Sequence, residues 1–91
     1  MVVRMYVIVV YDVFIERVNK VCQFLRQHLN WIQNSVFEGE LTKGGLAQVK
    51  HGLKEIIDKS VDSVIFFEVS SKKWIKKEII GTEKREVTTI L

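Results

Sequence analysis

The chain has 91 residues, of which 47% are hydrophobic, and its net charge is +3. This length predicts one domain, 1–91, and a domain of this size buries only about 60–65% of the surface that its unfolded chain exposes. The single cysteine, Cys22, excludes an intrachain disulfide, which fits a cytoplasmic protein. No apolar run reaches the roughly 18 residues of a membrane span, and no phosphate-binding glycine motif is present, so we expect neither a membrane partner nor a nucleotide cofactor.

The first half of the chain predicts a strand, a helix and a second strand. Residues 6–10 are β-branched or aromatic without alternation, which is typical of a central strand covered on both faces. Apolar residues then recur at steps of three and four over residues 15–29, which predicts a helix. Residues 31–41 predict the second strand, where Gly39 indicates a bulge or a close backbone approach. Gly44 and Gly45 then predict a loop.

The second half predicts a helix over residues 46–57 and a strand over residues 63–69. A fourth strand requires either that residues 31–41 form two short strands or that residues 74–80 supply it, and we favour the second arrangement. Both give an α+β fold of ferredoxin-like type, an antiparallel sheet with two helices on one face. Residues 87–91 are also strand-like, and the sheet edge of a second copy is a plausible place for them.

Asp12 is the first candidate for chemistry, because it ends a strand predicted to be central. A carboxylate is a hard oxygen ligand that suits Mg²⁺ or Mn²⁺. The alternative is that Asp12 caps the turn into the first helix. One carboxylate is too few for most metal sites, but a two-fold homodimer would supply a second copy of it.

Several neighbours of Asp12 are candidates for contact with a nucleic acid. Tyr11 points the opposite way in a regular strand and is either a packed aromatic or a hydrogen-bond donor to a phosphate or a water. Arg17 and Lys20 lie three residues apart and either face the same polyanion or form a solvated helix face. Trp31 and Phe37 could stack on bases, although aromatic residues in strands are usually core.

Three stretches taken together resemble a known family. They are residues 6–13 (YVIVVYDV) with the closely following 17–21 (RVNKV), and residues 31–41 (WIQNSVFEGEL). With the segment up to 66–69 (FFEV), they are similar to the Cas-two family, the second of the two core CRISPR adaptation proteins. The stretch IQxSVFxG at this distance from the Tyr-Asp pair is the specific part of the resemblance.

The resemblance implies a ferredoxin-like homodimer in which residues 78–91 are exchanged with the partner copy or docked on it. It implies that two copies of Asp12 hold Mg (or Mn) between them. The implied activity is that of a metal-dependent endonuclease, of the endoribonuclease type, acting on RNA or double-stranded DNA in the spacer acquisition of antiviral defence. Tyr11, Arg17 and Lys20 would position the nucleic-acid backbone. Alternatively, the dimer is a non-catalytic scaffold that binds a DNA duplex together with a CRISPR integrase partner protein.

Overall fold

The computed structural model describes residues 3–85. Six regular elements and one short 3₁₀ turn follow in the order β1 (Arg4–Asp12), α1 (Ile15–Arg26), β2 (Asn30–Gln33), β3 (Val36–Thr42), α2 (Lys43–Ile56), β4 (Ser63–Val69) and the turn Lys72–Trp74. This β-α-β-β-α-β order is that of a ferredoxin-like fold. The strand-like residues 87–91, and with them the end of the segment expected to dock on a second copy, lie outside the described residues.

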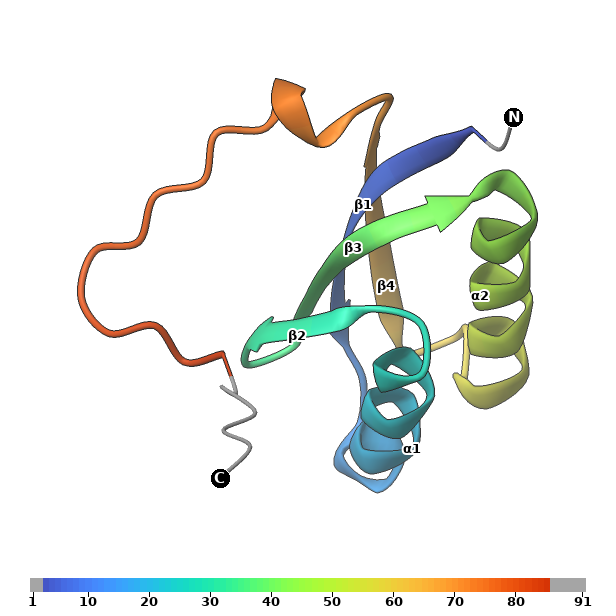
Figure 1. Ribbon diagram of the computed structural model, residues 1–91. Helices are drawn as coiled ribbons and strands as arrows, with labels where there is room; N and C mark the ends of the chain where they lie inside the picture. The colour runs from blue at the N-terminus through green and yellow to red at the C-terminus, as the bar shows by residue number, and fades with distance from the viewer. Residues whose placement is uncertain (1–2, 86–91) are drawn as a thin grey trace, which may run out of the picture.

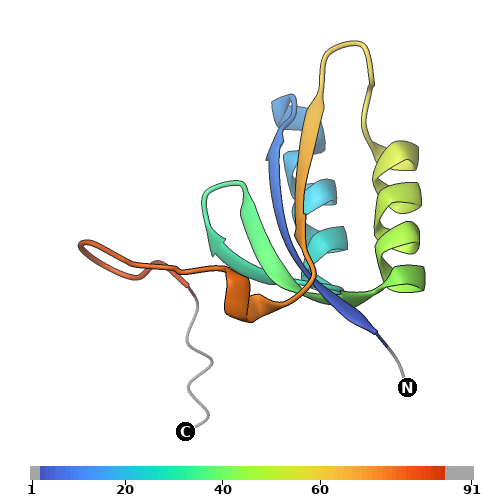
Figure 2. The same ribbon diagram turned by 90° about the horizontal axis from the view of Figure 1, so that it is seen from above.

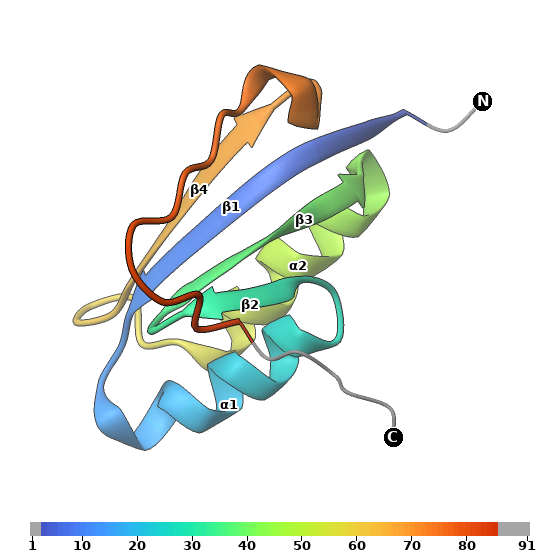
Figure 3. The ribbon, with the colours of Figure 1, turned by 60° about the vertical axis from the view of Figure 1, so that its left-hand side comes forward.

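The four strands form one antiparallel sheet in the order β2-β3-β1-β4. Both helices cover the same face of this sheet (Figures 1 and 2). Beyond β4 the chain turns back, and residues 75–85 run on the other side of the sheet, the side without helices (Figures 2 and 3). The predicted fold class is therefore confirmed. β1 is central, as the run of residues 6–10 predicts, but the helices cover only one of the two faces that were expected to be covered.

The source of the fourth strand was predicted wrongly. Residues 74–80 form no strand; instead, residues 31–41 divide between β2 and β3. The two strands are joined at Asn34, whose φ of 44° places it in the left-handed region. Asparagine tolerates this conformation better than most residues do, so the two-residue turn of Asn34 and Ser35 reverses the chain without a glycine. Residues 76–85 are exposed, which leaves them without the buried face that stabilises a strand.

The glycine pair was also assigned to the wrong element. Gly44 and Gly45 lie in the first turn of α2 and not in a loop. Thr42 caps this helix, because its hydroxyl oxygen accepts a hydrogen bond of 3.0 Å from the Gly45 N–H. The close approach expected at Gly39 is confirmed, since a Cβ there would lie 2.9 Å from Leu29 Cδ2.

The core lies between the sheet and the two helices. Val7, Val9 and Tyr11 point from β1 into it, whereas Ile8, Val10 and Asp12 belong to the opposite face of the same strand. The remaining buried hydrophobic side chains of this cluster are Val21, Leu25, Leu29, Phe37, Leu41, Leu46, Val49 and Leu53. No helix within residues 3–85 is long and apolar enough to cross a membrane.

Candidate functional site

Asp12 ends β1 with its carboxylate free. It pairs with Ser63 of β4, is exposed, and makes no side-chain hydrogen bond or ion pair within residues 3–85. The alternative that Asp12 caps the first helix is wrong, because the N-cap of α1 is Phe14 and the Phe14 N–H donates to Asp62 instead, at 2.9 Å. The Asp12 carboxylate is thus available to bind a ligand or a second chain.

Asp12 also ends a strip of apolar side chains on the helix-free side of the sheet. Ile8 and Val10 precede it on the same face of β1, and their partners in β4 are Phe67 and Ile65. Phe67 is 54% exposed and Ile65 49% exposed, although both are large and apolar. We call these four residues the open sheet face. In a single chain, an exposed apolar surface therefore ends at an unpaired carboxylate.

The buried carboxylate of Asp62 joins the loop that follows Asp12 to the loop that precedes its partner Ser63. The Asp62 side chain has no exposed surface, and it accepts two bonds from Arg17, at 2.5 Å from Nε and 3.1 Å from Nη2. It accepts two further bonds of 2.9 Å each, from the backbone N–H groups of Phe14 and Asp58. These bonds join the segment that follows β1 to the segment that precedes β4, the two segments that flank the Asp12–Ser63 pair.

The protonation of this pair follows from the same contacts. The hydrogen bonds from Arg17 hold the pKa of Asp62 far below its ordinary value, although burial opposes them. The Asp62 hydrogen bond in turn raises the pKa of Arg17. Asp62 therefore stays ionised, and both of its oxygens already accept hydrogen bonds from the protein. It is a structural carboxylate and not a second free ligand beside Asp12. Sequence patterns offer no signal for it, because Arg17 lies far away in the chain.

The two basic residues of α1 differ in their surroundings. Arg17 is partly buried and engaged, since its Nη1 also lies 3.2 Å from Glu16 Oε1. Lys20 is exposed and has no ion-pair partner in the described part of the chain. The structure thus gives Arg17 a role in fixing the loop after Asp12 and leaves Lys20 as the free cation of this predicted pair.

Two of the aromatic candidates are packed inside the protein. Tyr11 and Phe37 stack with ring centroids 6.2 Å apart, and Phe37 has no exposed surface. Tyr11 points away from Asp12 into the core, where burial raises the pKa of its hydroxyl. The packed alternative given for both residues is therefore the one that the structure shows. In this conformation neither ring presents a face to a base, and the Tyr11 hydroxyl is not beside the Asp12 carboxylate.

Trp31 lies half-buried in β2, where it is the cross-strand partner of Phe37 and packs against the edge of the core. Its indole Nε1–H donates to the Asn34 backbone oxygen at 2.9 Å, and the Arg26 guanidinium lies 5.7 Å from its ring centroid. The indole ring thus already makes a cation–π contact with Arg26 and a hydrogen bond to the β2–β3 turn.

A second buried carboxylate anchors the segment that follows β4. Glu38 of β3 accepts hydrogen bonds from the Tyr6 hydroxyl and from Lys77 Nζ, the latter at 2.6 Å. Burial alone would raise the pKa of Glu38, but the bonds from Lys77 and Tyr6 outweigh it and keep the pKa below its ordinary value. Sequence reasoning missed this network too, because charged residues in a strand and a tail are unremarkable separately.

The described part of one chain, residues 3–85, does not assemble a complete metal site. Within residues 3–85, no group of three or more His, Cys, Asp or Glu side chains could hold a metal ion. Asp12 alone combines a free carboxylate with exposure at a strand end. A carboxylate is a ligand type that suits Mg²⁺, but one carboxylate is too few for such a site.

Residues 5–77 match the family described as CRISPR associated protein Cas2. The chain belongs to this family. The protein named CRISPR-associated endoribonuclease Cas2 of Pyrococcus furiosus is 53% identical over 87 residues, which are 96% of this chain and 100% of that protein. The protein of the same name from Methanosarcina acetivorans is 51% identical, with the same coverage.

Solved Cas2 structures have the same fold. A structure titled "Crystal structure of cas2" is 44% identical in sequence, with a TM-score of 0.83 over 97% of this chain and 99% of that one. The Cas2 of Streptococcus pyogenes is 32% identical, with a TM-score of 0.74 over 84% of this chain and 99% of that one. The Cas-two resemblance read from residues 6–69 is therefore confirmed.

Proposed function

We propose that the chain is a metal-dependent endonuclease of the CRISPR system that cleaves phosphodiester bonds in RNA or double-stranded DNA. One observation carries the proposal: the carboxylate of Asp12 is unpaired at the end of the open sheet face. The names of the relatives, CRISPR-associated endoribonuclease, support the reaction and favour RNA as the substrate to test first.

A homodimer completes the site in this proposal. The exposed side chains of Phe67 and Ile65 lie on the face that the helices leave uncovered. Burial of apolar surface stabilises association by about 25 cal/mol per Å² before the entropic costs of binding. When two open sheet faces pack about a two-fold axis, each chain contributes one Asp12 at the rim of the interface. The dimer thus both covers the apolar strip and doubles the number of carboxylates.

Each residue then has a defined task. The two Asp12 carboxylates would hold Mg²⁺ or Mn²⁺, and the bound ion would polarise a phosphate and lower the pKa of a water molecule. Arg17 and Asp62 fix the direction in which the chain leaves β1, so that Asp12 is held in one orientation. Lys20 is free to contact a phosphate of the backbone by charge alone.

The scaffold function remains the second candidate, and one observation favours it. Tyr11 and Phe37 are buried in the core. In one chain, therefore, neither the Tyr11 hydroxyl nor the Phe37 ring lies beside Asp12, where it could transfer a proton to a phosphate or stack on a base. Under this alternative the dimer binds duplex DNA beside the integrase partner, through sequence-independent phosphate contacts and without cleaving.

The Asp12→Asn variant separates the two functions. For the endonuclease, we expect Mg²⁺-dependent cleavage of single-stranded RNA and duplex DNA to fall more than about 100-fold, with dimer formation unchanged. Glu16→Gln is the matched control, because it removes an exposed carboxylate four residues away and should leave cleavage unchanged. Equal cleavage by wild type and Asp12→Asn would refute the metal role of Asp12. Duplex binding by wild type without any Mg²⁺-dependent cleavage would support the scaffold instead.

A further inference from the structure

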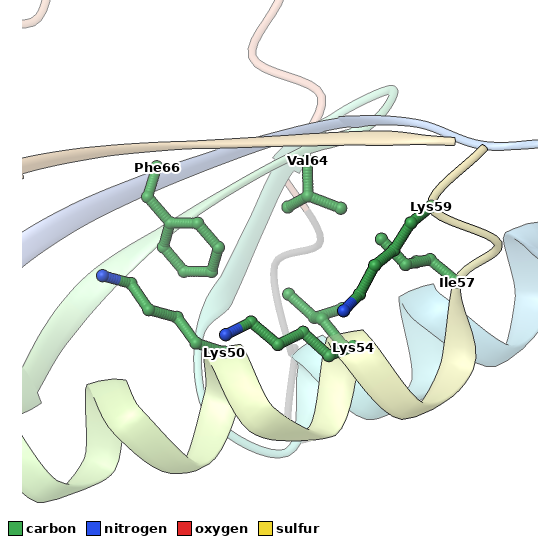
Figure 4. Close-up of a pocket in the computed structure, with 7 residues that line it drawn as sticks. Lys50, Lys54, Ile57, Lys59, Val64 and Phe66 are labelled. Atoms are coloured by element: carbon green, nitrogen blue, oxygen red, sulfur yellow. The ribbon is translucent and has the colours of Figure 1, made fainter. Parts of the chain in front are cut away.

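A basic cavity lies on the helix side of the sheet, between α2 and β4. It has a volume of about 280 Å³ and is lined by Lys50, Leu53, Lys54, Ile57, Lys59, Val64 and Phe66. Figure 4 shows Lys50 and Lys54 extending from α2 and Lys59 reaching into the same space from the segment before β4. Because β4 is an edge strand of the sheet, no further strand formed by residues 3–85 closes the cavity on that side.

The floor of the cavity is apolar. Leu53 is buried, and Ile57, Val64 and Phe66 are half-buried and pack against the core. Such a floor favours a ligand that has an apolar or planar body, because water gains few hydrogen bonds there. The volume lies just below the range for small-molecule sites, about 300–1,000 Å³, which suits one small unit and not a long segment.

The rim of the cavity carries positive charge that the protein does not neutralise. No carboxylate lines it. Lys50 is paired with Glu68 at 2.9 Å and lies 5.4 Å from the Phe66 ring centroid, so its charge is compensated. Lys54 and Lys59 have no ion-pair partner among residues 3–85. Two uncompensated ammonium groups beside an apolar wall attract an anion more strongly than the same groups in open water.

We propose that this cavity is a binding subsite for one nucleotide of an RNA strand. The base lies on Val64 and Phe66, and the phosphate is bound between Lys54 and Lys59. A nucleotide unites a planar base with an anionic phosphate, which matches the floor and the rim together. An acidic peptide matches the rim, but the lysines beside the outer strand oppose the pairing of a further strand there.

The cavity also has a defined relation to Asp12. Val64 in the floor directly follows Ser63, the partner of Asp12 in β4, and the two residues face opposite sides of the sheet. An RNA strand bound at Asp12 reaches the cavity by passing around the first residues of β4. The subsite therefore rests on the proposed function for the identity of its ligand and would hold a nucleotide flanking the cleaved bond.

Adenosine 5′-monophosphate is the probe for the first test, monitored by NMR chemical shifts of the backbone amides. We expect saturable shifts at Leu53, Val64 and Phe66, with binding weakened roughly tenfold in the double variant Lys54→Gln/Lys59→Gln. The control Lys72→Gln/Lys76→Gln removes the same charge from two exposed lysines outside the cavity and should bind like wild type. Absence of saturable shifts at these amides, or equal affinity of the double variant, would overturn the proposal.

An oligouridylate in buffer with EDTA tests the strand itself, because no cleavage then competes with binding. Loss of the one phosphate bound between Lys54 and Lys59 should reduce the magnitude of the slope of log K against log salt concentration by about 0.7, and the control variant should keep the wild-type slope. An unchanged slope in Lys54→Gln/Lys59→Gln would contradict the subsite.

Failure of the subsite is distinguishable from failure of the nuclease. The mononucleotide titration needs neither metal nor cleavage, so it can succeed when Asp12→Asn leaves cleavage unchanged. An acidic, leucine-containing peptide that shifts Val64 and Phe66, where adenosine monophosphate does not, would assign the cavity to a protein partner and overturn the nucleotide proposal.

Discussion

Arg17 and Asp62, 45 residues apart in the chain, form a two-point ion pair with Nε 2.5 Å from Oδ2 and Nη2 3.1 Å from Oδ1. The same carboxylate binds the backbone of Phe14 and Asp58. The loop that leaves the candidate site and the loop that enters β4 are therefore held by one side chain. The loop that follows the exposed Asp12 is thus fixed by a carboxylate that is itself buried.

Replacing Asp62 with Asn should destabilise the fold. The amide keeps an acceptor for one backbone N–H but removes the charge, which leaves the partly buried guanidinium of Arg17 without its partner. We expect the melting temperature, followed by circular dichroism, to fall by about 5 °C or more. Glu16→Gln breaks only the exposed contact of Arg17 and should cost less than about 0.5 kcal/mol. Equal melting of Asp62→Asn and Glu16→Gln would contradict the role of the ion pair.

The pKa of Asp62 predicts how stability depends on pH. Because this pKa is lowered in the folded state, its contribution is complete above the ordinary carboxyl pKa of about 3.9 and is lost as pH falls below that value. The lowered pKa values of Glu38 and Asp58 act in the same direction. We expect the urea midpoint of wild type to fall between pH 7 and pH 3, and to fall less in Asp62→Asn. The same decrease in both proteins would show that Asp62 does not titrate with unfolding.

Two glycines of α2 should respond oppositely to alanine. A Cβ at Gly52 would lie 2.1 Å from Phe24 Cζ of α1, whereas a Cβ at Gly44 would meet nothing within 4 Å. Gly52→Ala should therefore cost about 1–3 kcal/mol by separating the two helices, while Gly44→Ala should gain up to about 1 kcal/mol from helix propensity. Chemical denaturation measures both. A neutral Gly52→Ala would mean that Phe24 has room to move.

Phe37 should behave as a core residue. Phe37→Ala should cost about 3–5 kcal/mol, since the ring is fully buried and stacked on Tyr11. Phe37→Leu preserves most of the volume, so we expect a folded protein that binds RNA with wild-type affinity by fluorescence anisotropy. A folded Phe37→Leu variant with clearly weakened RNA binding would instead show that the ring contacts the ligand.

Local patterns predicted the elements whose burial is regular. Residues 63–69 form β4 with the expected bounds, and Asp12 ends β1 as expected. The wrong predictions arose where the deciding contact is specific to one residue. The left-handed conformation of Asn34 divides residues 31–41, and the Thr42 cap draws Gly44 and Gly45 into a helix. Neither the conformation of Asn34 nor the Thr42 cap alters the pattern of apolar residues from which strands and helices are predicted.

The candidate site was predictable in position but not in its supporting contacts. A strand-end carboxylate is visible in the sequence, whereas the Arg17–Asp62 pair arises only when two distant loops meet. The same is true of the bond from Lys77 to Glu38, which joins the segment after β4 to β3. Tyr11 and Phe37 belong to the core because of strand alternation and the position of their strands, which a motif alone does not show.

Mixtures of wild type and Asp12→Asn test the central claim most directly, that two copies of Asp12 form one site. Chains are mixed in varied ratios, allowed to exchange subunits, and assayed for Mg²⁺-dependent RNA cleavage at constant total protein. If both carboxylates are required, activity falls as the square of the wild-type fraction, to about a quarter of the wild-type rate in an equal mixture. A linear decrease, to about half the rate in that mixture, would show that each Asp12 acts alone and would contradict the shared site.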